Sequence, residues 1–213
     1  MMWPEIVFAG CAAVVVYVLF GYPLLAGWLA ARRERPVHKR FEAKSVSVLL
    51  PVRNGERWLR EKLDSLFKLD YPRQQLQIIV ISDGSEDATD AIAREFAARG
   101  GIEFLRIAPG GKAAALNAGM ERARGEILFF TDVRQELEPT SLRELVAALG
   151  DPEVGVASGE LIIREGATQQ EADVGLYWKY EKWVRRRLSD IDSVLGATGA
   201  IYAMRRDLAR PLP

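Results

Sequence analysis

One carboxylate and one guanidinium stand two residues apart at a place where an ion could bind. The apolar run Ile127–Phe130 is followed by Thr131 and Asp132, and Arg134 comes two residues later. A second carboxylate at that place would favour a divalent metal ion, because hard cations need several oxygen ligands. A guanidinium instead binds phosphate through paired hydrogen bonds. Three interpretations remain open: a metal site that lacks one ligand, a site that works without metal, or no site.

Three other predicted strands also run into polar loops that carry Gly or Asp. These loops read PVRNGE (51–56), DGSEDATD (83–90) and APGGKAAALN (108–117), and the carboxylate loop reads DVRQ (132–135). The carboxyl ends of parallel strands lie at one edge of a sheet, where ligands bind. One such loop is an ordinary turn, but four at one edge favour a ligand site. The GGK stretch fails the phosphate-loop pattern, because Ala113 follows Lys112.

The elements that must position these loops alternate along the chain. Apolar runs predict strands at 45–50, 77–82, 103–107, 126–131 and 154–160. Helices are predicted at 56–69, 85–99 with Ser85 as N-cap, 112–124, 139–149 and 170–188. Near-continuous apolar strands are typical of sheets buried on both faces. We therefore expect an α/β fold with a mostly parallel sheet flanked by helices.

The first 31 residues predict a transmembrane helix. No charged residue occurs in the stretch 6–31, and about 20 apolar residues are enough to cross a bilayer. A cleaved signal peptide needs a basic start and a shorter apolar core, so a membrane anchor is favoured, with a buried core helix as the alternative. Basic residues at 32–40 place the following chain on the cytoplasmic side. We expect residues 32–44 to be a basic linker and 45–213 to be one domain.

The composition excludes some partners. The chain has 213 residues with 29 basic and 29 acidic side chains, and this balance argues against a nucleic-acid partner. A single cysteine, Cys11, excludes an intrachain disulfide. The basic amphipathic stretch 170–188 has three possible positions: on a membrane surface, on the sheet, or along a binding groove.

The order of several segments resembles the family 2 glycosyltransferases of the GT-A fold. These segments are LLPVRNGE, IIVISDGSEDAT, GGKAAALN, FFTD and GATGAIYAMRR, which together span about 46–208. The resemblance implies a Rossmann-like sheet and an inverting enzyme that uses nucleotide-diphosphate sugars. The N-terminal apolar helix is similar to that of members that build polysaccharides or glycolipids at the cytoplasmic membrane face.

The resemblance also implies roles for individual residues. Near the base and ribose it places Pro51, Asn54 and Glu56, with Asp83 reading the base. Near the nucleotide and diphosphate it places Lys112 and Asn117, and Asp132 matches the first aspartate of the DxD motif as a tentative metal ligand. The segment at the acceptor side contributes Gly199, Arg205 and Arg206.

The sequence departs from the family pattern at Arg134, which stands where the second DxD aspartate is expected. A Mg²⁺ or Mn²⁺ ion is therefore in doubt. In one hypothesis, Arg134 replaces part of the charge that the metal gives the leaving diphosphate. In the other, metal still binds through Asp132 and the diphosphate, and Arg134 turns away.

The family's catalytic base belongs to a later acidic motif, so we expect it beyond Pro213 and expect the chain to be a fragment with little transferase activity of its own. The expected function is transfer of a sugar, from a UDP-sugar by resemblance, to a polysaccharide or lipid-linked acceptor. The alternative is a membrane-tethered module that binds nucleotide sugars without transferring them. A dinucleotide-dependent oxidoreductase is disfavoured, since PVRNGE replaces the required G-x-G-x-x-G.

Overall fold

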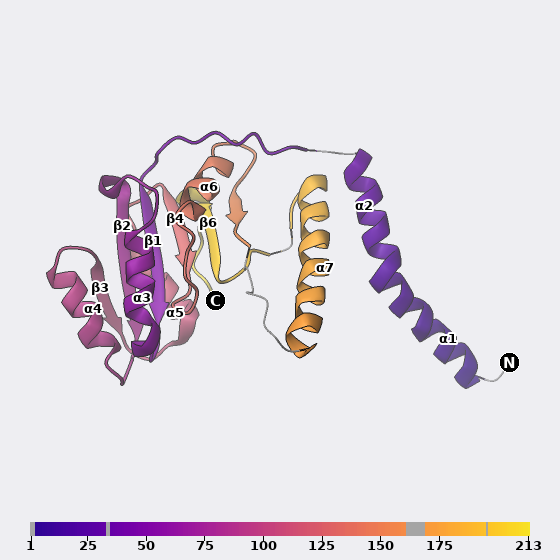
Figure 1. Cartoon of the computed structure of the whole chain (residues 1–213), viewed down its shortest axis with the longest axis horizontal. Coiled ribbons are helices and arrows are strands. Elements are labelled where there is room, and N and C mark those ends of the chain that lie inside the picture. The colour runs from indigo at the N-terminus through magenta and orange to yellow at the C-terminus, as the bar shows by residue number, and fades with distance from the viewer. Residues whose placement is uncertain (1–2, 33–34, 161–168, 195) are drawn as a thin grey trace. The chain divides into compact units, whose positions relative to one another are not determined.

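The computed structural model describes the chain as two compact units (Figure 1). The described residues are 3–32, 35–160, 169–194 and 196–213. The sheet unit consists of Val37–Leu161 and Ala197–Pro213. The helical unit consists of Met1–Pro36 and Ile162–Gly196.

The sheet unit confirms the predicted α/β fold with a mostly parallel sheet. Its strands within the described residues are β1 (Val46–Val52), β2 (Leu76–Asp83), β3 (Glu103–Ile107), β4 (Ile127–Thr131), β5 (Val156–Ser158) and β6 (Ile201–Arg205). They lie in the order β3-β2-β1-β4-β6-β5. The pairs β1/β2, β2/β3 and β1/β4 are parallel, whereas β6 runs antiparallel to both β4 and β5.

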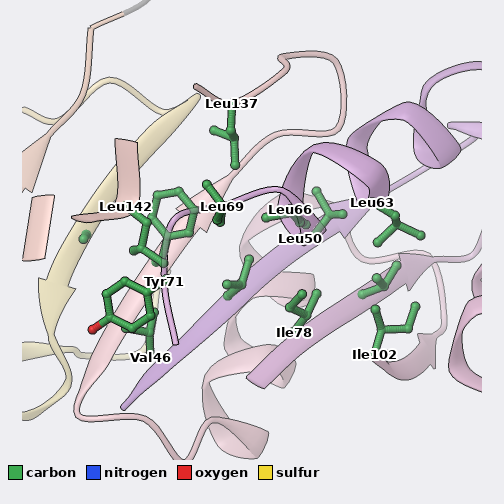
Figure 2. Close-up of a cluster of buried hydrophobic side chains, with 14 of the residues drawn as sticks. Val46, Leu50, Leu63, Leu66, Leu69, Tyr71, Ile78, Ile102, Leu137 and Leu142 are labelled. Atoms are coloured by element: carbon green, nitrogen blue, oxygen red, sulfur yellow. The ribbon is translucent and has the colours of Figure 1, made fainter. Parts of the chain in front are cut away.

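Helices cover both faces of this sheet. They are α3 (Glu56–Phe67), α4 (Thr89–Ala98), α5 (Gly111–Arg122) and α6 (Ser141–Ala148), with short 3₁₀ turns at η2 (Arg73–Gln75) and η3 (Arg206–Leu208). Leucines and other apolar residues of α3, α4 and α6 form the larger core cluster, and Figure 2 shows Leu63 and Leu66 of α3 in the same cluster as Leu50 and Ile78 of the strands. Helix α5 packs on the opposite face.

Alternation within β1 explains why its sequence is apolar at every position except Ser47. Val48 and Leu50 belong to the larger cluster, and Leu49 between them belongs to the cluster under α5. Successive side chains of a strand point to opposite faces. A strand covered by helices on both faces is therefore apolar along nearly its whole length, as the sequence predicted.

The predicted N-cap of the second helix of the sheet unit is wrong. Helix α4 begins at Thr89, and its N-cap is Ala88. The hydroxyl of Ser85 instead accepts a hydrogen bond from the backbone N–H of Asn54 at 3.1 Å. The cap signal failed because a neighbouring loop, and not the helix itself, uses the Ser85 side chain.

The helical unit contains one helix long and apolar enough to cross a membrane, by length and composition, among the described residues. It runs from Trp3 to Arg32 as α1 (Trp3–Val16), a π-helical turn η1 (Tyr17–Gly21) and α2 (Tyr22–Arg32). No residue of α1 or η1 is buried. In α2, Pro23, Ala26 and Ala30 are buried, so the buried residues of the Trp3–Arg32 helix all lie after Gly21.

The π-helical turn precedes a proline. Pro23 has no backbone N–H, so the carbonyl of Leu19, four residues earlier, lacks its usual helical donor. The hydroxyl of Tyr180 donates to that carbonyl at 3.1 Å. Tyr180 belongs to α7 (Gln169–Ile191), which lies within the same unit. A side chain from a distant segment thus supplies the donor that the helix lacks at its proline.

Small residues on α2 allow α7 to approach closely. A Cβ added to Gly27 would lie 3.4 Å from the ring of Trp183. Beyond the helix, the backbone N–H of Arg35 donates to the carbonyl of Asp190 at 3.1 Å, and its guanidinium pairs with Asp192. Small side chains at a helix contact are typical of close packing. The sequence did not predict that α7 groups with the N-terminal helix, and the proposed division at residue 45 stays a prediction.

A substitution at Gly125, which lies between α5 and β4, tests how closely this connection packs against β1. A Cβ at this position would lie 2.4 Å from the backbone nitrogen of Ser47, whose hydroxyl accepts the Gly125 N–H at 2.8 Å. We expect Gly125→Ala to lower the free energy of unfolding by about 1–3 kcal/mol, because backbone of β1 must move. The control is Gly196→Ala, where an added Cβ meets no atom of the described residues within 4 Å apart from its chain neighbours. Equal denaturant midpoints for the two variants would contradict this packing.

Candidate functional site

The strand order reverses between β1 and β4, and this reversal marks the candidate site. Strands β2 and β3 lie on one side of β1, while β4 and β6 lie on the other. In open α/β sheets, ligands bind at the carboxyl ends of the strands at such a reversal. The loops that follow β1 and β4 meet there, since a Cβ on Gly55 would lie 3.6 Å from Val133.

The loop after β1 is bonded to the loop after β2. The side-chain oxygen of Asn54 accepts from the N–H of Glu86 at 2.9 Å, and the Glu56 carboxylate accepts from the N–H of Ala88 at 2.9 Å. Between them, the N–H of Gly55 donates to the Thr89 hydroxyl at 2.8 Å. Asn54 and Glu56 were predicted to contact the nucleotide. The structure gives their side chains a first role in holding two loops together.

Asp87 completes this contact. Its carboxylate accepts from the N–H of Glu56 at 3.0 Å and from the N–H of Thr89 at 2.9 Å. Burial acts to raise the pKa of Asp87, but the hydrogen bonds from Thr89 and Glu56 outweigh it and lower the pKa below its ordinary value. The ionised carboxylate is therefore the form that joins the two loops.

Asp83 holds the start of α5. Its carboxylate is buried and accepts from the N–H of Gly110 at 2.7 Å and the N–H of Gly111 at 3.0 Å. Gly111 has a φ of 83°, a left-handed conformation that favours glycine. The predicted contact of Asp83 with a base stays a prediction, and its observed partners are the two glycines that precede Lys112.

Lys112 and Asp132 meet at the edge. The Lys112 ammonium bonds the Asp132 carboxylate at 2.5 Å and lies 3.5 Å from the carbonyl of Gly199. The Lys112 side chain is 51% exposed and that of Asp132 is 33% exposed, so solvent reaches both. The structure therefore brings together three of the predicted site residues, from α5, from the end of β4 and from the turn before β6.

Pro51 and Asn117 have other observed surroundings. Pro51 is half-buried within β1, opposite Ile81 of β2. Asn117 lies in the second turn of α5, where its side-chain amide donates to the Leu212 carbonyl at 2.9 Å and accepts from the Leu212 N–H at 2.8 Å. The observed role of Asn117 is to fasten the residues that follow η3.

Arg205 and Arg206 lie toward the opposite end of the strands from Asp132, and their predicted acceptor-side role stays a prediction. Strand β6 runs antiparallel to β4, so Ile201 pairs with Thr131 and Arg205 pairs with Ile127. Four residues of strand separate the two ends by about 13 Å. Arg205 donates to the Pro152 carbonyl and Arg206 to the Ala123 carbonyl. Sequence alone did not reveal the direction of this strand.

The Arg134 guanidinium points toward α3. It lies 4.9 Å from the ring centroid of Trp58, a distance at which a cation is attracted to an aromatic face. Asp132 contacts Lys112 of α5, on the other face of the sheet. The two residues of the DVR segment therefore engage different helices in this structure.

Lys62 is a residue of this region that the sequence analysis missed. Its side chain is 1% exposed, and its ammonium donates to the Thr131 hydroxyl at 2.7 Å and to the Gln135 carbonyl at 2.6 Å. Burial lowers its pKa to about 7, although the charge of Asp132 acts in the opposite direction. A signal was present, because Lys62 interrupts the apolar face formed by Leu59 and Leu66.

Tyr202 also borders the site. Its ring stacks on Phe130 at a centroid distance of 4.4 Å with an interplanar angle of 5°. Burial raises the pKa of its hydroxyl, and the negative charge of Asp132 adds to this effect. Tyr202 therefore places an aromatic surface beside the carboxylate at the end of β4.

The protein groups at this edge do not by themselves form a divalent-metal site. Within the residues that the structure describes, no group of three or more His, Cys, Asp or Glu side chains is placed to hold a metal ion. The carboxylate at the DxD position, Asp132, is already paired with Lys112. Hard divalent ions need several oxygen ligands, and a neighbouring ammonium opposes their binding.

Comparison with known proteins identifies the fold and then the family. The structure is similar to the mannosyltransferase PcManGT from Pyrobaculum calidifontis in complex with GDP-Man and Mn²⁺, with a TM-score of 0.74 and 27% identity over 92% of this chain and 56% of that one. It shares its fold with the Mycobacterium tuberculosis glucosyl-3-phosphoglycerate synthase, at a TM-score of 0.53 and 20% identity. The sheet unit thus has the GT-A fold.

The sequence model of Glycosyl transferase family 2 matches residues 47–212. The chain therefore belongs to this family of enzymes, as its motifs implied. A curated relative, the probable glycosyltransferase YdaM of Bacillus subtilis, is 31% identical over 134 residues, which cover 59% of this chain and 31% of YdaM. The putative glycosyltransferase EpsH of the same organism is 33% identical over 52% of this chain and 32% of EpsH. The alignments thus span about a third of these relatives.

The burial of Lys62 predicts that the stability of the wild type, compared with a Lys62→Met variant, depends on pH. Its pKa falls from an ordinary 10.5 to about 7 on folding, so the unfolded chain binds more protons between these values. Stability then rises with pH across this window and is lost as pH falls towards 7. The Lys62→Met variant cannot titrate at this position. Relative to it, we expect the free energy of unfolding of the wild type to rise by up to about 1.4 kcal/mol per pH unit. Denaturation of both proteins at several pH values from 7 to 10 measures it, and a constant difference would contradict the burial of Lys62.

Proposed function

We propose that the chain binds the donor of an inverting glycosyltransferase, a nucleotide-diphosphate sugar, at the carboxyl edge of its sheet. The observation that carries this proposal is the exposed Lys112–Asp132 pair beside Gly199, at the reversal of strand order in a GT-A fold. A diphosphate attracts an ammonium and a helix N-terminus, and Lys112 lies in the first turn of α5. Family resemblance favours a UDP-sugar, and the GDP-Man complex of PcManGT makes GDP the nucleotide to compare.

In this proposal, Lys112 shifts its ammonium from Asp132 to the diphosphate when the donor binds. Asp132 is then free to accept a hydrogen bond from the donor sugar. An acceptor hydroxyl attacks the anomeric carbon, the bond to the diphosphate oxygen breaks, and the nucleoside diphosphate leaves with the bonding electrons. The acceptor proton passes to a general base. Lys112 stabilises the charge that develops on the leaving oxygen.

We further propose that the acceptor is a glycan or a lipid-linked glycan at the cytoplasmic face of a membrane. The segment from Trp3 to Gly21 is free of buried residues, and at 1.5 Å per residue it is about 28 Å long, close to the thickness of a hydrocarbon core. Pro23, Ala26 and Ala30 are covered within the helical unit. This difference supports a lipid-crossing part that ends near Gly21. Basic residues from Arg32 onward favour the cytoplasmic side.

The poly(ribitol-phosphate) β-N-acetylglucosaminyltransferase TarS of Staphylococcus aureus is a relative at 27% identity over 49% of this chain. Its name gives poly(ribitol phosphate) as the acceptor, and this supports a polymeric acceptor here. The alternative function is a tethered module that binds the donor. Donor binding without sugar transfer would support it.

Titration of UDP and of GDP into the full chain in detergent tests donor binding. We expect Lys112→Ala to weaken binding of the preferred nucleotide by about tenfold or more, because a charge-assisted contact to phosphate is lost. The control is Lys68→Ala, an exposed lysine at the C-cap of α3. If neither nucleotide binds the wild type, the proposed function is wrong. If both variants bind as the wild type does, Lys112 is not the phosphate ligand.

The same titration with Mg²⁺, with Mn²⁺ and with a chelator tests the metal question. We expect the wild type to bind UDP nearly as well in chelator, because Lys112 supplies positive charge beside a single carboxylate. We expect Arg134→Asp, which restores a second carboxylate, to make binding respond to Mn²⁺. Wild-type binding that appears only with metal would favour a cation held by Asp132 and the diphosphate.

A further inference from the structure

Helix α3 presents two side chains to the turn that carries Asp132. Trp58 and Lys62 are four residues apart, so they lie one above the other on the same side of the helix. Lys62 joins the two ends of the turn, through the Thr131 hydroxyl and the Gln135 carbonyl. Trp58 lies under the guanidinium of Arg134, between those ends.

The hydrogen bonds continue from Lys62 to the start of β6. The Thr131 hydroxyl donates to the Ala200 carbonyl at 3.2 Å, and the N–H of Asp132 donates to the same carbonyl at 3.2 Å. Gly199, the residue before Ala200, presents its carbonyl to Lys112. One buried ammonium therefore connects α3 to both segments that frame the Lys112–Asp132 pair.

We propose that Lys62 and Trp58 are positioning residues of the donor site, which hold the Thr131–Gln135 turn so that Asp132 meets Lys112 without a metal ion to organise it. This inference rests on the donor site proposed above and adds the residues that set its geometry. A turn with paired metal ligands is held by the ion that they share. In this chain, Lys62 bonds both ends of the turn from the protein side, and Arg134 binds an aromatic ring where a second ligand is expected.

The role of Lys62 depends on its two hydrogen bonds and not on its charge. An ammonium has three N–H donors and a neutral amine has two, so either form can bond Thr131 and Gln135. Loss of the side chain would leave the Gln135 carbonyl without this donor. If Lys62 had a merely structural role, loss of its side chain would lower stability alone. If it positions the turn, the loss also changes the affinity for the diphosphate.

The test compares UDP with UMP, because the turn faces the diphosphate and the base lies elsewhere in the proposed site. Lys62→Met is expected to weaken UDP binding by the full chain about tenfold, as loss of a buried hydrogen bond to a charged group would do, with UMP affinity changed less than about twofold. Trp58→Leu, which keeps an apolar side chain, is expected to weaken UDP binding about threefold through loss of the cation–ring contact. Calorimetric titration measures all of these affinities.

Ser65→Ala is the matched control. Ser65 is buried one turn further along α3, and its hydroxyl donates to the Lys62 carbonyl at 2.8 Å, away from the turn. Its substitution should reduce stability and leave UDP affinity unchanged. Folded Lys62→Met and Trp58→Leu proteins that bind UDP as the wild type does would overturn the inference. If Lys62→Met does not fold, Trp58→Leu decides. If the wild type binds neither UDP nor GDP, the donor site itself fails.

Discussion

A parallel sheet brings its loops to one edge, and the backbone groups of those loops need hydrogen-bond partners there. The chain meets this constraint mainly with short polar side chains that reach the next loop along. Asn54 and Glu56 bond the loop after β2, and Asp83 bonds the two glycines before α5. These contacts rigidify the edge because each loop holds its neighbour. These contacts also position Lys112, because Asp83 fixes the glycines that precede it.

The sequence predicted the parts of the structure that local patterns determine. Apolar runs located the strands, and the confirmed sheet follows from their burial on both faces. The polar loops located the edge, where Lys112, Asp132 and Gly199 meet. The family motifs could not show that Asn54 and Glu56 have protein partners, because a side chain that bonds a neighbouring loop and one that bonds a ligand look alike in sequence.

Other features depend on pairings between distant residues, which periodicity does not report. The direction of β6, which puts Arg205 opposite Ile127, is set by its pairing with β4 and cannot be read from local sequence. Tyr180 bonds a carbonyl freed by Pro23, about 160 residues away in the chain. Lys62 gave a visible signal, a lysine within an apolar helical face, but its partners Thr131 and Gln135 are known only once α3 lies over the end of β4. Long-range packing, more than local propensity, determines the contacts of such residues.

The charges around Asp132 explain how a site with one carboxylate can still bind a diphosphate. A diphosphate beside an unpaired carboxylate would be repelled, and in metal-dependent enzymes the ion separates the two. Here the Lys112 ammonium lies between Asp132 and the Gly199 carbonyl, and Lys62 holds the turn from behind through its hydrogen bonds. Arg134 is held by Trp58 on the other side. Cations on rigid elements provide positive charge before a ligand arrives, so less reorganisation is needed when it binds. In the proposed donor site, a second carboxylate then has no necessary role, and Arg134 at its position can instead anchor the turn.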